Sequence, residues 1–284
     1  MSKRPDQLRS ANLTWDLLVL TGALAGAGAV SGFLAGLFGV GGGSIIVAAL
    51  YQAFTYTGIS DDLCMRMSLG TAFAIMVPTS AASFIGHLRR GSADRSVARG
   101  WILPVAIGVG AGSLVASRLE SGPLKAIFVV LVLANAFKLL SGWPAWRAAA
   151  DVPSRAAVRV SGLVIGFLSS LIGIGGGVFG NMFLTAYGRS MHQAIGTTAS
   201  LGAIISLAGT CTFVLLGLGA SGTPAGSLGF VSVIAFCVVA PLAAGLAPFG
   251  VRLAHRFTKQ QLRIGFGLFL IAICSRFVLA FVLR

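Results

Sequence analysis

Acidic residues are scarce in this sequence, and charge of either sign is rare. Charged residues make up 10% of the 284 positions, with 7 Asp and Glu against 21 Lys and Arg. The acidic residues all fall in predicted tails, loops or segment ends, at Asp6, Asp16, Asp61, Asp62, Asp94, Glu120 and Asp151. Cation and proton-coupled carriers commonly keep a carboxylate at mid-membrane. Because the long apolar segments have no carboxylate near their middle, transport of a cation is disfavoured and an anionic substrate is favoured.

Cysteine and histidine are also few, and their spacing argues against metal and catalytic chemistry. Neither a disulfide framework nor a zinc site is predicted, because no C-x-x-C pair occurs among the four cysteines, Cys64, Cys211, Cys237 and Cys274. The three histidines are isolated, with no H-E-x-x-H motif and no Ser/His/Asp grouping. We therefore expect no metal, no cofactor and no enzymatic activity.

Hydrophobic residues, in contrast, make up 56% of the chain, and the mean hydropathy is +0.91. A transmembrane helix needs about 20 mostly apolar residues. Apolar segments lie at about 15–40, 44–57, 64–88, 99–117, 123–143, 158–173, 177–188, 193–217, 226–250 and 260–283. The sequence therefore predicts an all-α polytopic membrane protein embedded in the lipid bilayer.

The formal net charge of +14 is spread over short loops between these apolar segments. A nucleic-acid partner would call for a soluble basic domain or for aromatic residues among the basic ones, and neither is present. Basic loops of this kind are typical of the cytoplasmic side of a membrane protein. We expect a multi-pass protein with no nucleic-acid partner and make no prediction of its oligomeric state.

Two of the apolar segments, 44–57 and 177–188, are too short to span a bilayer. Each follows a glycine cluster directly, so the pairs 15–57 and 158–188 are predicted to be helices broken at mid-membrane. We expect about eight transmembrane helices in two homologous halves, the first helix of each half being broken at its glycines.

The sequence repeats itself across those halves, since residues 28–43 and 162–177 share nearly the same glycine spacing. We assign 1–14 to a cytoplasmic tail, 15–143 to a first repeat, 144–157 to a linker and 158–284 to a second repeat. Eight whole spans would put the basic loops at 89–99 and 252–263 on opposite sides. A re-entrant hairpin over 158–188 would put both in the cytoplasm, which the charge rule favours; both arrangements stay open.

The glycine clusters are the first candidate site. Three glycines in succession cost roughly 1 kcal/mol each in a helix and expose backbone groups that lipid cannot satisfy. A broken helix would instead turn the N–H groups of the following half-helix, from Ser44 and Val178 onward, toward an anion. The candidate glycines are Gly39, Gly41, Gly42 and Gly43 in the first cluster and Gly173, Gly175, Gly176 and Gly177 in the second. Close helix packing is the alternative explanation.

A second candidate group recurs in both halves. Arg66, Gly70 and Thr71 have the counterparts His192, Gly196, Thr197 and Thr198. A spacing of four puts the basic residue and the glycine on one helix face, with the hydroxyl beside them, which suits an oxyanion. The alternative is that Arg66 and His192 lie at helix starts and face the membrane interface.

The duplicated G-x-G-G-G clusters, the later Gly-Thr pairs and a Pro-x-x-x-Gly in a following helix resemble the sulfite exporter TauE/SafE family over nearly the whole chain. The resemblance implies a two-repeat transporter of the bacterial inner membrane. It also implies export of sulfite, sulfoacetate or another sulfur-containing organic anion.

We therefore predict a secondary transporter for a small anion, sulfite or an organosulfonate. The anion would lie between the broken helices, bound by backbone N–H groups, Ser44, Thr71, Thr197, Thr198 and Asn181. An anion channel lined by the same donors and a membrane scaffold without transport activity are the alternatives.

Overall fold

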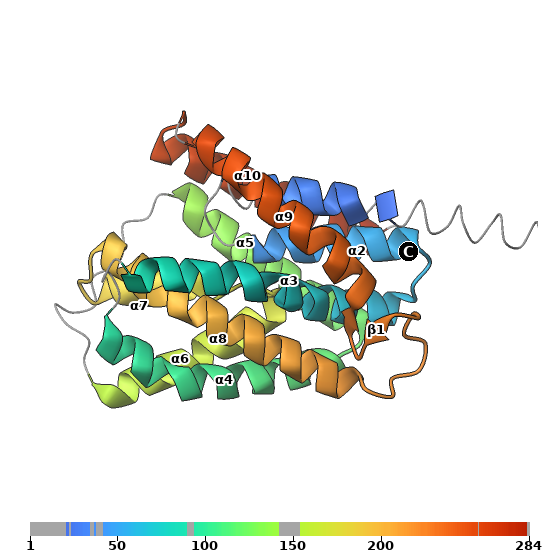
Figure 1. Ribbon diagram of the computed structural model, residues 1–284, viewed down its shortest axis with the longest axis horizontal. Helices are drawn as coiled ribbons and strands as arrows, with labels where there is room; N and C mark the ends of the chain where they lie inside the picture. Colours follow the sequence, from blue (N-terminus) through green and yellow to red (C-terminus); the bar gives the residue numbers. More distant parts are fainter. Residues whose placement is uncertain are drawn as a thin grey trace, which may run out of the picture.

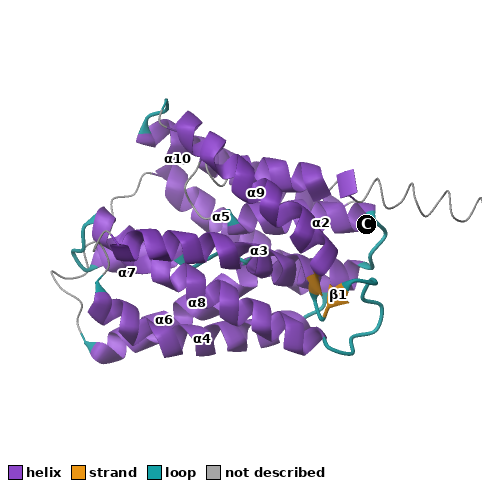
Figure 2. Ribbon diagram, viewed as in Figure 1, coloured by secondary structure: helices purple, strands orange, loops and turns teal. Residues whose placement is uncertain are grey.

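The computed structural model describes residues 21–22, 24–34, 37, 42–89, 94–141, 154–254 and 256–282. These residues form a bundle of helices whose long axes run roughly side by side, with one small hairpin of strands at one end (Figures 1 and 2). The predicted all-α polytopic class is confirmed.

Nine labelled helices and two strands make up most of the described chain. They are α2 (Gly43–Tyr56), α3 (Asp61–Arg89), α4 (Arg95–Arg118), α5 (Ser121–Ser141), α6 (Arg155–Ile172), α7 (Gly177–Ala186), α8 (Met191–Gly217), β1 (Ser227–Leu228), β2 (Val231–Ser232), α9 (Val233–Ala254) and α10 (Lys259–Val282). A further short helix covers Leu24–Leu34. Among the described helices, seven are long and apolar enough to cross a membrane, and they are α3, α4, α5, α6, α8, α9 and α10.

Polar side chains cap the starts of α4 and α8. The Asp94 carboxylate accepts from the N–H groups of Ser96 and Val97 and so caps α4. Ser190 and Gln193 form a reciprocal capping box at the start of α8. Such caps satisfy N–H groups that have no partner within the helix, which stabilises these starts at the membrane boundary.

The segment expected as helix from residue 226 onward begins differently. Ser227 pairs with Ser232 and Leu228 with Val231 in an antiparallel hairpin, and α9 starts at Val233. Gly226 and Gly229 both have positive φ, at 81° and 59°. Left-handed backbone at these glycines turns the chain and delays the helix by seven residues from the predicted start.

α6 and α7 form a hairpin that enters and leaves the bundle at one end. α6 runs parallel to α4, since Gly162 packs on Trp101 and Gly112 on Phe167. α7 then returns toward the end where α6 begins, at the left of Figure 1. A hairpin of this kind is compatible with the re-entrant alternative for residues 158–188.

α3 and α8 cross the middle of the bundle in opposite directions. Gly70 of α3 lies against Phe213 of α8, and Gly202 of α8 lies against Ser80 of α3. The end of α3, the starts of α4 and α6, the end of α9 and the start of α10 all lie at the left end in Figure 1. The helix ends that flank these two basic stretches therefore lie at one end of the bundle.

Candidate functional site

The second glycine cluster breaks the chain between α6 and α7. Gly173 ends α6 with φ of 73°, and its N–H donates to the Ser169 carbonyl at 2.9 Å. Gly176 also has φ of 73° and precedes α7 without a side-chain cap. Side chains other than glycine rarely adopt this backbone conformation. Glycine is therefore needed at both ends of the break for conformational reasons.

The first turn of α7 is half-buried and has room around it. A Cβ atom built on Gly177 would meet no heavy atom within 4 Å. The N–H groups of Gly177, Val178 and Phe179 donate to no acceptor among the described residues. These three N–H groups and the positive end of the α7 dipole can therefore serve a negatively charged ligand.

Asn181 lies one turn farther along the same face of α7 as Gly177, since residues four apart are neighbours on a helix. Its Oδ1 accepts a hydrogen bond of 2.7 Å from the Thr198 hydroxyl of α8. The Thr198 hydroxyl also lies 2.9 Å from the Ala194 carbonyl oxygen. Because Oδ1 is engaged, the Asn181 amide is oriented with its NH₂ group available to donate. The structure thus brings two predicted site residues, Asn181 and Thr198, into direct contact.

The first glycine cluster has different surroundings. Gly42 has φ of 65° and precedes α2, whose first residues Gly43 and Ser44 are buried. A Cβ on Gly43 would overlap the Gly173 carbonyl oxygen and would lie 2.9 Å from the Met76 sulfur. The start of α2 is therefore packed directly against the break that follows α6. Gly39 and Gly41 lie outside the described residues.

This packing also sets opposite helix ends against each other. The carbonyl end of α6 carries partial negative charge, and the N-terminal end of α2 carries partial positive charge. Their close approach at Gly43 and Gly173 compensates both within the protein. The start of α7 has no such helix end against it among the described contacts. Of the two helix starts, that of α7 is the one with open space beside its first residue.

The two predicted site threonines Thr71 and Thr197 hold helix starts. The Thr197 hydroxyl accepts from the N–H of Asp94, the N-cap of α4, at 2.9 Å. The Thr71 hydroxyl accepts from the N–H of Ser232, just before α9, at 3.0 Å. Each threonine thus fixes a helix start in the opposite predicted half. Both hydroxyls are engaged inside the protein, away from the start of α7.

The remaining predicted residues of this group also contact protein. The Arg66 Nη2 donates to the Leu119 carbonyl at the C-cap of α4, at 2.8 Å. A Cβ on Gly70 would lie 2.7 Å from the Phe230 carbonyl oxygen, so Gly70 permits close packing of the strand hairpin. His192 lies in the first turn of α8, and its side chain is outside the described residues.

Two ion pairs join segments that are distant in sequence. Lys125 contacts the Asp61 carboxylate at 2.6 Å, and the Tyr51 hydroxyl donates to the same carboxylate at 3.0 Å. Arg189, before α8, pairs with Asp94 at 3.1 Å. The sequence predicted only that these acids lie in tails, loops or segment ends, because no local spacing links residues so far apart.

Comparison with known proteins gives a family. The family model described as sulfite exporter TauE/SafE matches residues 24–277. A probable membrane transporter protein of Haemophilus influenzae is 32% identical over 246 residues, covering 87% of this chain and 93% of the relative. A probable membrane transporter protein of Methanocaldococcus jannaschii is 25% identical over 263 residues, covering 89% of this chain and 93% of the relative. No solved structure matches the chain.

The family match extends from the short helix at Leu24–Leu34 into α10, so it includes both glycine breaks and all seven long apolar helices. The two relatives are both described as probable membrane transporter proteins, and each matches most of this chain. This chain therefore belongs to the sulfite exporter TauE/SafE family and is a multi-pass membrane transporter.

Proposed function

We propose that this transporter carries a small anion, sulfite or an organosulfonate, outward across a bacterial inner membrane, and that the anion binds at the start of α7. The half-buried first turn of α7 carries the proposal, with its three N–H groups and the open space beside Gly177. The description of the family as sulfite exporter supports the substrate class.

The chemistry of this site suits a compact oxyanion. Backbone N–H groups at a helix start present several donors to one negative centre, and the helix dipole favours its charge. The amide of Asn181 adds a further donor on the same face, held in place by Thr198. Such donors cannot coordinate a cation, and a neutral solute would gain nothing from the dipole.

The arrangement of the breaks also supports a carrier mechanism. Both lie inside the bundle, where α2 and the segment after α6 contact each other and Met76 of α3. Movement of one predicted half against the other would alter the surroundings of the α7 start without unfolding the hairpin of α6 and α7. We infer alternating access about this contact.

The experiment is transport by purified protein in proteoliposomes, with sulfite, sulfoacetate, taurine and sulfate as substrates. Saturable flux with counterflow of unlabelled substrate is expected for at least one of the first two. Single-channel currents without counterflow would identify a channel instead. No flux of any tested anion would contradict the proposed substrate class.

The site is tested by Gly177→Leu, which fills the space beside the α7 start without requiring positive φ. Transport should fall at least about tenfold while the thermal unfolding temperature stays unchanged, because the loss of one hydrogen bond to a charged ligand is already worth that much. Gly245→Leu in α9 is the matched control, since a Cβ on that exposed helical glycine also meets no atom within 4 Å. Equal transport by both variants would refute the assignment of the site to α7.

A further inference from the structure

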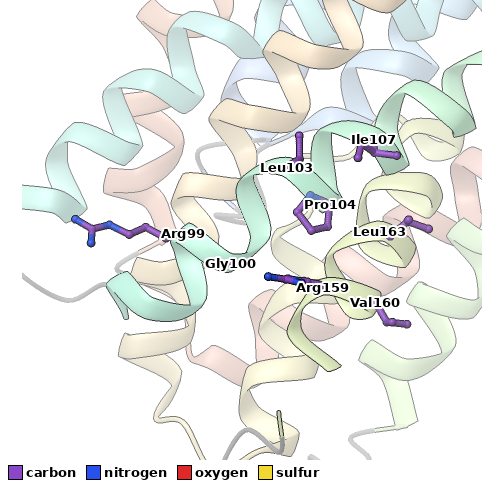
Figure 3. A pocket seen from close by; sticks show the side chains of 8 residues that line it. All are labelled: Arg99, Gly100, Leu103, Pro104, Ile107, Arg159, Val160 and Leu163. Atoms are coloured by element: carbon purple, nitrogen blue, oxygen red, sulfur yellow. The ribbon is translucent and has the colours of Figure 1, made fainter. Parts of the chain in front are cut away.

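A groove runs along the outer face of the bundle between α4 and α6. It has a volume of about 570 Å³ and is lined by Arg99, Gly100, Leu103, Pro104, Ile107, Arg159, Val160 and Leu163 (Figure 3). The two helices approach closely here because glycines face the partner helix. A Cβ on Gly166 would overlap the Val105 carbonyl, and one on Gly108 would overlap the Leu163 carbonyl. The close contact of the two helix backbones forms the floor of the groove, and larger side chains form its walls.

The walls of the groove are apolar and face outward. Leu103 is 68% exposed, Val160 64%, Ile107 53% and Leu163 44%. These residues lie on helices long and apolar enough to span a membrane, so the hydrocarbon phase is what surrounds them. The apolar length of the groove therefore suits an acyl chain.

One end of the groove is strongly basic. Arg99 and Arg159 are each the fifth residue of their helix, about 6 Å from the helix start. Because α4 and α6 run parallel, both arginines lie at the same membrane level, toward the end of the bundle that carries the basic loops (Figures 1 and 3). An arginine this close to the start of a membrane-spanning helix can reach the lipid headgroups with its long side chain.

Neither arginine has an anionic partner within the described protein. No ion pair or side-chain hydrogen bond of Arg99 or Arg159 occurs among the described residues. Asp94, the acid at the start of α4, is occupied by Arg189 and by the first N–H groups of its own helix. Two exposed guanidinium groups beside an apolar channel are complementary to a phosphate attached to acyl chains.

We propose that this groove is a binding site for an anionic phospholipid. The phosphate lies against the Arg159 guanidinium, and an acyl chain lies along Leu103, Ile107 and Leu163. Arg99, whose side chain points away from Arg159 in Figure 3, adds positive charge at the same end of the groove. The site is distinct from the start of α7, and its occupancy is measured without transport, so the proposal stands or falls independently of the proposed substrate. A lipid held across the α4 and α6 seam would tie the re-entrant hairpin to its neighbouring span.

The test is native mass spectrometry of the purified full chain, titrated with phosphatidylglycerol and with phosphatidylcholine of the same acyl chains. The unmodified protein should bind one phosphatidylglycerol at least about tenfold more tightly than phosphatidylcholine, since each basic residue near an anionic headgroup favours it several-fold. The double variant Arg99→Gln/Arg159→Gln should lose this preference. The control Arg256→Gln/Arg263→Gln removes two exposed arginines outside the groove and should keep it.

A second pair of variants tests the acyl chain. Val160→Trp places a large side chain in the groove, whereas Val130→Trp alters an α5 residue that is 63% exposed, nearly the same as Val160, and outside the groove. Binding of phosphatidylglycerol should weaken severalfold in the first variant and stay unchanged in the second. Equal binding of the two lipids by the unmodified protein would overturn the proposal. So would equal losses in the groove and control variants.

Discussion

The two glycine breaks are nearly identical in sequence and opposite in their surroundings. Gly43 and Gly177 occupy the same place in the predicted repeat, one residue after a glycine with positive φ. Gly43 is buried against the Gly173 carbonyl and Met76, whereas Gly177 has no atom within 4 Å of a built Cβ. A duplicated motif therefore builds two helix starts, of which one is sealed by protein and one is left accessible.

The difference has a physical origin in what lies opposite each start. The carbonyl end of α6 approaches α2, so protein dipoles compensate each other there. α7 begins beyond the break, and a Cβ on its first residue, Gly177, would meet no atom within 4 Å. A repeat supplies two copies of one helix start, but packing decides which copy has open space beside it.

Gly43→Ala should show the largest effect on stability. The added methyl group meets the Gly173 backbone, which cannot move aside as a flexible side chain could, and overpacking of this kind costs about 3 kcal/mol. The thermal unfolding temperature in detergent should fall by roughly 5–10 °C. Gly26→Ala, at a helical glycine with no atom within 4 Å, is the control and should leave it unchanged. Unaltered stability of Gly43→Ala would contradict the sealed first break.

Asn181→Leu should affect transport more than stability. The leucine removes the donor beside the α7 start, while the Thr198 hydroxyl keeps the Ala194 carbonyl as its acceptor. Loss of a hydrogen bond to a charged ligand corresponds to a roughly tenfold to hundredfold rise in KM. Proteoliposome kinetics measure it, and Thr198→Val, which leaves the amide in place, should raise KM less. The opposite ranking would move the site away from Asn181.

Thr71→Val and Thr197→Val should have similar effects on stability, whereas substitutions at the two glycine breaks should differ in their effects. Each removes an acceptor from a backbone N–H that begins a helix of the other predicted half. An unsatisfied N–H group should lower the free energy of unfolding by about 1–2 kcal/mol, which is measured as a lower unfolding temperature. KM should not change in either variant. A rise in KM with normal stability would instead show that these threonines contact substrate, as the sequence alone suggested.

Gly177→Ala should have the smallest effect. A Cβ at this position meets nothing within 4 Å, and alanine is a better helix former than glycine by up to about 1 kcal/mol. The unfolding temperature should stay the same or rise slightly, opposite in sign to Gly43→Ala. A clear loss of stability would mean that the second break is as tightly packed as the first.

Much of the fold could be predicted from the sequence because lipid leaves few alternatives. Long apolar segments must be helical, and the described spans follow the predicted ones closely, as α3 and α4 do. The prediction was wrong at residues 226–232, where a hairpin precedes α9. Positive φ at Gly226 and Gly229 is a property of the backbone that composition alone did not reveal.

The candidate site was predictable only in part. Asn181 and Thr198 were both named, and their contact joins α7 to α8. Thr197 is adjacent in sequence but points elsewhere, toward the start of α4, because neighbouring residues of a helix differ by about 100° in direction. The sequence presented three equivalent threonines, and nothing in their local pattern distinguished the one beside Asn181.

The sequence by itself determined that this is a membrane protein, that two glycine clusters interrupt its helices, and that its predicted apolar segments contain almost no acidic residues. Those conclusions follow from the cost of placing charge and unsatisfied backbone in hydrocarbon, which every residue incurs locally. The tertiary structure alone decided that the carbonyl end of α6 packs on the first residue of α2, whereas the first residue of α7, Gly177, keeps open space beside it. Burial and dipole compensation depend on which helix ends meet in space. The local sequence of a repeated motif does not determine those contacts.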